Sequence, residues 1–206
     1  MSEVQAPRGV AGRSRRGRAL VAGSIVLALI GGGVWWWAYG DSTVEVPDRI
    51  CGGALPGSAA AAVLPKEGTP YEERSDNEFG KGEEPEVWCH VDAGSQSIIF
   101  SSWWSVSDLG ARGAERSGNT AIQLGQSKGY TNEIDAELYM SCRGRSASGE
   151  WLKVRLARYQ GLDRPRDGQA AVHLAEMVGD AARYVANELG CEGASKIPRG
   201  VPSMKP

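Results

Sequence analysis

The sequence predicts an α+β domain that follows one transmembrane helix, with an antiparallel sheet of about four strands and helices packed on one face. Three observations support this fold class. Residues 19–39 form an uncharged, mostly apolar segment. Two pairs of alternating segments, each joined by a short turn, indicate two β-hairpins. A long amphipathic stretch near the C-terminus indicates a helix. The predicted order is one helix, then strand, strand and helix twice.

The segment 19–39 has the length and composition of a transmembrane helix. It contains no charged residue, and about 20 apolar residues suffice to cross the hydrocarbon core of a bilayer. Three consecutive tryptophans lie near its end, and such rings favour the lipid headgroup level. Residues 1–18 hold five arginines and one acid, and positive charge beside a span stays in the cytoplasm. We therefore expect a single-pass cell-membrane protein with a cytoplasmic N-terminus and an extracellular C-terminal domain.

Two other interpretations of this segment are a cleaved signal peptide and a lipoprotein. A cleaved signal peptide needs small residues at its cleavage site, whereas bulky Trp36 and Trp37 precede Ala38. Cleavage near Gly33 remains an alternative. A lipoprotein is disfavoured because the first cysteine, Cys51, lies far beyond the apolar segment.

The chain divides into five parts. They are a basic cytoplasmic arm, the transmembrane helix, a polar tether, an extracytoplasmic α+β domain and a disordered tail, at residues 1–18, 19–39, 40–48, 49–192 and 193–206. The tail is expected because it holds three prolines and few apolar residues. Beyond the arm the chain holds 24 acids and 18 bases. This negative balance argues against nucleic acid as a partner, because such binding depends on neutralising phosphates.

A short helix and a long loop are expected first in the domain. Leu55–Leu64 is rich in alanine, with Pro56 in its first turn and Pro65 where a helix would stop. Lys66–Glu86 holds eight acids and three bases, and we expect it to be a solvated loop. Its acids lack the regular spacing of a calcium-binding loop.

The first hairpin and a second helix follow. Val87–Asp92 alternates between an apolar face and a face with Trp88 and His90, as expected for a half-buried strand. Ser97–Val106 is the second strand of this hairpin. Ser107–Ser117 is expected to be a helix with Ser107 as its N-cap.

The second hairpin precedes the longest helix. Asn119–Thr131 is expected to be irregular because of its glycines. Ala136–Arg143 and Glu150–Gln160 alternate and form the hairpin, around a turn at 146–149. The last helix is expected to begin with Asp167 as its N-cap and to end at Gly190 in a left-handed conformation.

All four cysteines lie in the predicted extracytoplasmic part. An even number of cysteines in an oxidising compartment indicates two disulfides. Of the three possible pairings we favour Cys51–Cys89 and Cys142–Cys191, because each ties a helix end to a nearby strand. Four free buried thiols are the alternative. Zinc is disfavoured because the chain has no CxxC or HxxxH spacing, and no metal or cofactor is expected.

Several short segments together resemble a known group of proteins. They are Cys51-Gly52-Gly53-Ala54-Leu55, Trp88-Cys89, Tyr139-Met140-Ser141-Cys142 and the terminal helix before Cys191. In this layout the chain is similar to the small extracytoplasmic domains of actinobacterial membrane-anchored proteins and envelope lipoproteins. The resemblance covers most of Ile50–Gly193 and departs from the lipoproteins in using a span instead of a lipid. It implies a fold and a location, and it carries over no catalytic residue.

The sequence contains a candidate binding face and no catalytic motif. There is no GxSxG elbow, phosphate loop or dinucleotide fingerprint. Six residues alternate away from the apolar strand faces: Trp88, His90, Tyr139, Trp151, Lys153 and Arg155. Tryptophan, tyrosine and arginine are favoured anchors at interfaces. The alternative is that these rings only pack against one another beneath the cations.

These observations favour a membrane protein that presents a disulfide-linked extracytoplasmic binding domain. The expected partners are the membrane and an envelope protein, a cell-wall component or a second copy of the chain, with the ligand and the oligomeric state left open. The alternative is a cell-surface enzyme of the hydrolase type. It would require polar groups that converge in a pocket, such as His90 against a carboxylate.

Overall fold

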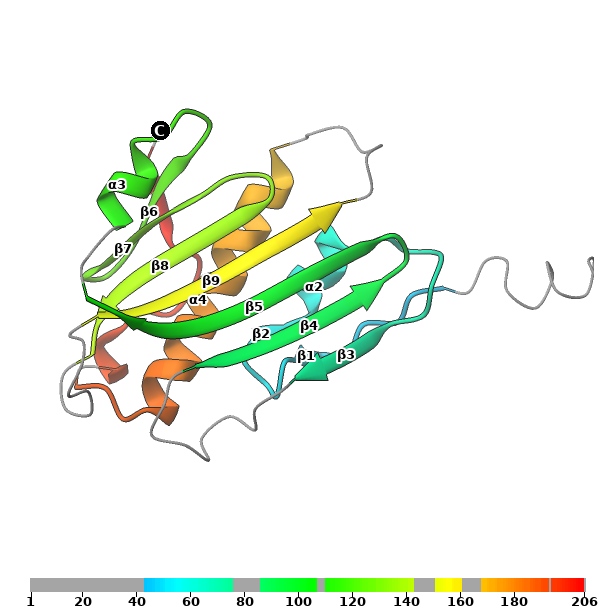
Figure 1. Ribbon diagram of the computed structural model, residues 1–206, viewed down its shortest axis with the longest axis horizontal. Helices are drawn as coiled ribbons and strands as arrows, with labels where there is room; N and C mark the ends of the chain where they lie inside the picture. Colours follow the sequence, from blue (N-terminus) through cyan, green and yellow to red (C-terminus); the bar gives the residue numbers. More distant parts are fainter. Residues whose placement is uncertain are drawn as a thin grey trace, which may run out of the picture. The chain divides into compact units, whose positions relative to one another are not determined.

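Alternation of apolar and polar residues along the chain builds one large antiparallel sheet (Figure 1). The structure, a computed structural model, describes residues 43–75, 86–106, 110–142, 151–160, 168–192 and 194–205. Within these residues eight strands pair in the order β10-β6-β7-β8-β9-β5-β4-β3. In chain order they are β3 (Glu72–Ser75), β4 (Val87–Ala93), β5 (Gln96–Ser105), β6 (Thr120–Leu124), β7 (Ser127–Thr131), β8 (Asp135–Ser141), β9 (Trp151–Gln160) and β10 (Ser203–Lys205). Two short strands, β1 (Arg49–Ile50) and β2 (Leu55–Pro56), form a separate pair.

Strand β9 joins the two halves of the large sheet. It pairs with β5 along its whole length, from Gln96 opposite Gln160 to Ser105 opposite Trp151, and with β8 on its other side. The hairpin β4–β5 and the hairpin β8–β9 therefore meet through their second strands at the centre of the sheet, as Figure 1 shows.

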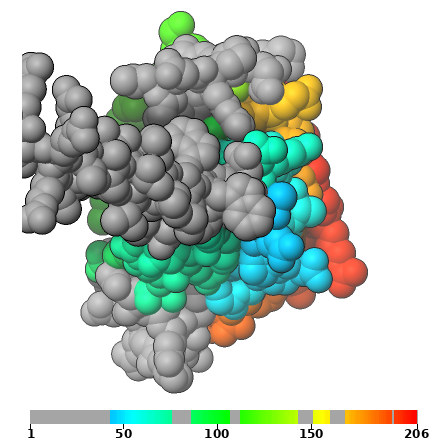
Figure 2. Space-filling view, turned by 90° about the vertical axis from the view of Figure 1, so that its right-hand side faces the viewer, coloured from blue at the N-terminus to red at the C-terminus, as the bar shows by residue number. Residues whose placement is uncertain are grey.

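Helices α2 (Gly57–Val63) and α4 (Gln169–Glu188) cover one face of the sheet. Seen from the side in Figure 2, the cyan segment around α2 and the orange segment of α4 lie to the same side of the green strands. The apolar side chains of the strands point to this side. Fully buried there are Ile98, Phe100, Leu138, Leu152, Leu156 and Leu174. Burial of each such side chain stabilises the fold by about 1.5–3 kcal/mol.

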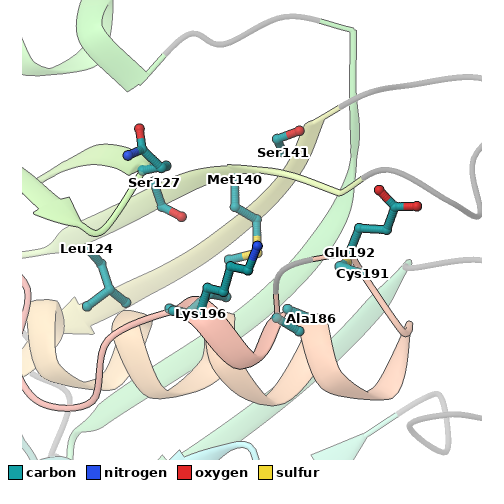
Figure 3. A pocket seen from close by; sticks show the side chains of 11 residues that line it. Leu124, Ser127, Met140, Ser141, Ala186, Cys191, Glu192 and Lys196 are labelled. Carbon is teal, nitrogen blue, oxygen red and sulfur yellow. The ribbon is translucent and has the colours of Figure 1, made fainter.

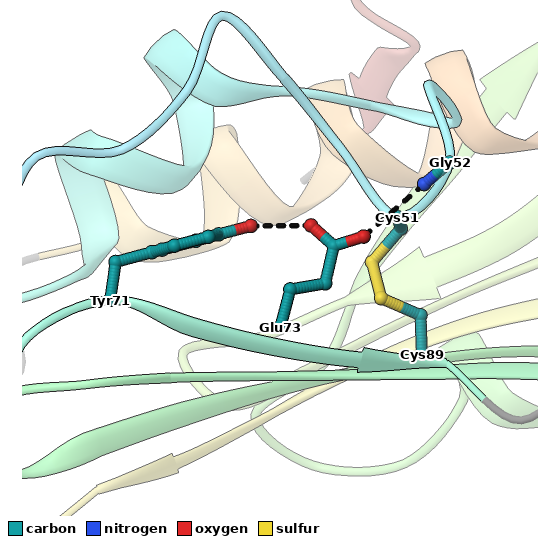
Figure 4. The surroundings of a disulfide bond; sticks show 5 residues. All are labelled: Cys51, Gly52, Tyr71, Glu73 and Cys89. Carbon is teal, nitrogen blue, oxygen red and sulfur yellow. Dashed lines mark hydrogen bonds between the residues drawn. A yellow bond between two sulfur atoms is a disulfide. The ribbon is translucent and has the colours of Figure 1, made fainter.

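The turn between β1 and β2 has a left-handed backbone. Cys51, Gly52 and Gly53 adopt φ angles of 55°, 63° and 94°, in a region that glycine tolerates and other residues avoid. A disulfide joins Cys51 to Cys89 in β4, with their Cα atoms 5.6 Å apart. Beside this disulfide, the backbone amide of Gly52 donates a hydrogen bond of 3.3 Å to the Glu73 carboxylate in β3 (Figure 4). The β1–β2 hairpin is thus attached to the large sheet both covalently and by hydrogen bonding.

A second disulfide fixes the end of α4. Cys142 follows β8 directly and is bonded to Cys191, just beyond the helix, with a Cα–Cα distance of 4.7 Å. Between the helix and this cysteine, Gly190 adopts a φ of 63°, as expected for a left-handed helix end. The structure confirms the predicted pairing, Cys51–Cys89 and Cys142–Cys191, and none of the four cysteines is free.

The predicted α+β fold class is wrong. The described residues are mostly β, with eight strands in the large sheet and two in the small one, where the sequence predicts about four. Strands β4, β5, β8 and β9 lie close to their predicted positions. The other four come from segments predicted to lack structure: β3 from the polar loop, β6 and β7 from the irregular segment, and β10 from the disordered tail.

The prediction that all helices pack on one face is also wrong. Helix α3 (Gly110–Ala114) is shorter than the predicted helix and packs on β7, on the face opposite α4. Gly113 in α3 lies so close to Tyr130 that an added Cβ would come within 2.2 Å of the tyrosine ring. Glycine is therefore required for this contact. Residues 107–109, the turn at 146–149 and Asp167 lie outside the described residues.

No helix within the described residues is long and apolar enough to cross a membrane. The predicted transmembrane helix at 19–39 lies outside them. All described residues belong to one compact unit, Asp41–Pro206.

Candidate binding face

The sheet face opposite α2 and α4, hereafter the open face, carries the six predicted binding residues. In each strand these residues alternate with buried ones, and antiparallel pairing puts partners on the same side. Among the described helices only the short α3 packs on this face. As a result, Trp88 in β4 is 37% exposed and Tyr159 in β9 is 56% exposed. The open face is therefore accessible to solvent at large aromatic side chains.

The centre of the open face is a network of four charged residues and one tyrosine. Glu137 in β8 is buried, and its Oε1 lies 2.8 Å from Nζ of Lys153 and 3.4 Å from Nε of Arg155. The Tyr139 hydroxyl donates a hydrogen bond of 2.9 Å to its Oε2. Arg155 also donates two hydrogen bonds, of 3.0 and 3.2 Å, to the carboxylate of Asp135. Both carboxylates are therefore held in fixed positions by cations.

Aromatic rings surround the ammonium group of this network. Nζ of Lys153 lies 4.7 Å from the centre of the Trp103 ring and 5.3 Å from that of Tyr139. At these distances the rings attract a cation. Lys153 is thus held by a carboxylate and two rings together, and the pairing of β9 with β5 on one side and β8 on the other places all these groups around it.

The structure brings together three of the six predicted residues. Tyr139, Lys153 and Arg155 belong to the network. Trp151 lies at the start of β9, opposite Ser105 and Ser141. Trp88 and His90 are in β4, which β5 separates from β9. The open face therefore has a charged part over β8 and β9 and an aromatic part toward β4.

Sequence reasoning missed Asp135, Glu137 and Trp103 as members of this face. The signal was present, because Glu137 alternates with the apolar residues of β8 just as Tyr139 does. A lysine that lies largely out of water needs a paired acid, and this requirement would have pointed to Glu137.

His90 lies against a carboxylate, which is one part of what the hydrolase alternative requires; two cavities elsewhere in the described part of the chain, of about 360 and 320 Å³, are lined by other residues. Nε2 of His90 is 3.2 Å from Oδ1 of Asp92, and the Ser97 hydroxyl donates a hydrogen bond of 2.8 Å to the same oxygen. The carboxylate thus lies between the serine and the imidazole. In a Ser-His-Asp triad the imidazole contacts the serine directly and accepts its proton. This order of contacts does not activate Ser97 as a nucleophile.

Within the described ranges, no group of three or more His, Cys, Asp or Glu side chains is arranged to hold a metal ion. A cavity of about 360 Å³ lies on the other side of the sheet, between the end of α4, η1 (Ala194–Lys196) and strands β6–β8 (Figure 3). Its lining includes Leu124, Met140 and Cys191, with Glu192 and Lys196 as opposite charges. It has no excess of either charge that would select a ligand.

The protonation state of Tyr130, which the carboxylates of the network influence, makes the stability of the fold depend on pH in the alkaline range. Burial first, and then the carboxylates of Glu137 and Asp135, raise the pKa of Tyr130 well above its ordinary value of 10.0. A pKa that is higher in the folded than in the unfolded state stabilises the fold fully below pH 10 and progressively less above it. We expect the free energy of unfolding to fall as the pH rises above 10, and Tyr130→Phe to reduce this fall.

Urea unfolding at pH 9 and pH 11 measures how steeply the free energy of unfolding falls with pH in the wild type and in Tyr130→Phe. Tyr159→Phe, at an exposed position of the same face, is the matched control and should leave the slope unchanged. Equal slopes for wild type and Tyr130→Phe would contradict the expectation.

Comparisons with known proteins find no similarity on which to base the function. No protein-family model matches the chain, and no curated protein or solved structure matches it. The geometry of the open face is therefore the basis for a functional proposal.

Proposed function

We propose that this protein is a single-pass membrane protein whose extracytoplasmic domain binds a component of the cell envelope through the open face. The observation that carries the proposal is the uneven cover of the sheet, whose open face is covered by the short α3 alone among the described helices. Of the described helices, α2 and the 20-residue α4 lie on one face, whereas the other face presents tryptophan, tyrosine, lysine and arginine side chains at its surface. Of these residue types, tryptophan, tyrosine and arginine dominate the binding energy at protein interfaces.

The location outside the cytoplasm is supported by two features. All four cysteines are paired in disulfides, and such bonds persist in oxidising compartments. The uncharged segment 19–39 with five arginines before it has the pattern of a span with a cytoplasmic N-terminus.

The binding role is tested by removing the two tryptophans that lie outside the charge network. We expect Trp88→Ala and Trp151→Ala each to lower the yield of the partner crosslinked to the full-length protein in intact cells by at least tenfold. The physical reason is that truncating a tryptophan anchor costs about 2 kcal/mol or more of binding energy. Mass spectrometry of the crosslinked species gives the yield.

Val201→Ala is the matched control, because this apolar side chain is 48% exposed but lies in the C-terminal segment. It should leave the yield unchanged. If both tryptophan variants keep the wild-type yield and melting temperature, the open face is not the binding surface.

A further inference from the structure

A cavity of about 320 Å³ lies on the open face where α3 packs over the sheet. Arg112 and Arg116 line it from the α3 side, and Tyr130, Tyr139, Glu137 and Lys153 line it from β7, β8 and β9. Its volume is at the lower end of the range for small-ligand pockets. It can therefore hold one functional group on a small organic body.

The lining has an excess of positive charge. Three of its residues are cations and one is a carboxylate, and the carboxylate of Glu137 is already 2.8 Å from the ammonium of Lys153. Arg112 and Arg116 form no ion pair with another described residue, and both are exposed. Beyond the N-terminal arm the chain carries more acids than bases. A positive pocket on a negative domain attracts anions to this one place.

The wall of the cavity is rigid and aromatic. Tyr130 and Tyr139 are 6% and 3% exposed, and the hydroxyl of each donates a hydrogen bond to a network carboxylate. Gly113 lets α3 approach the Tyr130 ring, and this contact holds the arginines beside the aromatic surface. The rings therefore form a fixed floor under the cavity, and the exposed guanidinium groups at its edge can reach an anionic group placed there.

We propose that this cavity binds the oxyanion group, carboxylate or phosphate, of a small organic ligand, with Arg112 and Arg116 as the anion-binding residues. Guanidinium groups match the geometry of carboxylate and phosphate oxygens. The inference deepens the proposed function, because it gives the open face a ligand class, and it rests on that face being the binding surface.

Ligand-observed NMR with the full chain in a non-ionic detergent tests the inference. The probes are benzoate, phenyl phosphate and the neutral benzamide. We expect at least one of the two anions to bind at least ten times more tightly than benzamide, and their relative affinities distinguish a carboxylate from a phosphate ligand. The double variant R112Q/R116Q should weaken anion binding at least tenfold. R199Q, at an exposed arginine away from the cavity, should not.

Three results overturn the inference: no saturable binding of either anion, equal binding of benzamide, or unchanged binding in R112Q/R116Q. The comparison of anions with benzamide uses only the wild-type protein, so it stands even if the double variant is unstable. A different result would contradict the proposed function itself. Partner capture that does not depend on Trp88 and Trp151 contradicts the function, whereas absent anion binding with capture still dependent on them contradicts only this inference.

Discussion

Replacing Cys51 and Cys89 together by alanine is expected to lower the free energy of unfolding by about 4 kcal/mol. The disulfide closes a loop with a sequence separation of 38 residues, and loss of such a loop increases the entropy of the unfolded chain. Both sulfurs belong to fully buried residues, so the variant also loses packing in the core. Denaturant unfolding monitored by tryptophan fluorescence under non-reducing conditions measures the change.

A second variant separates the covalent bond from the backbone conformation. Cys51 has a φ of 55°, which costs an alanine roughly 1 kcal/mol more than a glycine. C51G/C89A should therefore be more stable than C51A/C89A by roughly 0.5–1 kcal/mol, once the flexibility of glycine is included. A loss of less than about 1 kcal/mol in C51A/C89A would show that the bond does not hold the hairpin to the sheet.

Replacing Glu137 by alanine is expected to lower the free energy of unfolding by about 3–5 kcal/mol. The carboxylate is the ion-pair partner of Lys153 and a second partner of Arg155, and it accepts a hydrogen bond from Tyr139. The side chains of Glu137 and Lys153 are only 8% and 15% exposed. Removing the acid leaves a lysine charge away from water without its counter-ion.

Thermal and urea unfolding of Glu137→Ala give the loss directly. Glu115→Ala is the control, because this glutamate is exposed and makes no ion pair within the described part of the chain; it should change stability by less than about 0.5 kcal/mol. Glu137→Gln keeps a hydrogen-bond acceptor for Tyr139 and should lose less than the alanine variant. Equal stability of Glu137→Ala and wild type would mean that the network contributes nothing to the fold.

The strands that could be predicted from the sequence are the long ones with regular alternation. In each of β4, β5, β8 and β9 most of the alternate positions that face the core are apolar, with Gln96, Ser102 and Arg158 as exceptions, and this pattern is sufficient evidence for a half-buried strand. The same strands gave the correct face for all six candidate residues. Alternation within a strand determines the face of each side chain without knowledge of its neighbours.

Physical reasons explain why the sequence did not predict the other strands. In β7, Gly129 suggested irregular structure, but an added Cβ at this position would lie 1.8 Å from the carbonyl oxygen of Glu137. The glycine is there because the neighbouring strand approaches closely. Strand β3 is exposed at every residue, as is common for a charged edge strand. Strand β10 pairs with β6 over three residues, and so short a strand has no pattern of its own.

Predicting the whole charge network from the sequence would have required knowing which strands pair across the sheet. The hairpin β8–β9 puts Glu137 opposite Arg155, and this much follows from a predicted hairpin. Trp103 reaches Lys153 only because β5 pairs with β9, which brings together segments about 50 residues apart. The position of α3 over Tyr130 likewise depends on the folded arrangement.

The disulfide between Cys51 and Cys89 has a mechanical consequence. A pull on the chain from its N-terminal side acts first on residues 43–50, which are held by a few backbone hydrogen bonds, the Arg49–Asp180 ion pair and the burial of Ile50. At Cys51 the tension crosses a covalent bond into β4, a strand with neighbours on both sides. The chain between the two cysteines carries no load. Stretching the protein from this end should therefore give a short first extension, followed by rupture of the sheet as a unit.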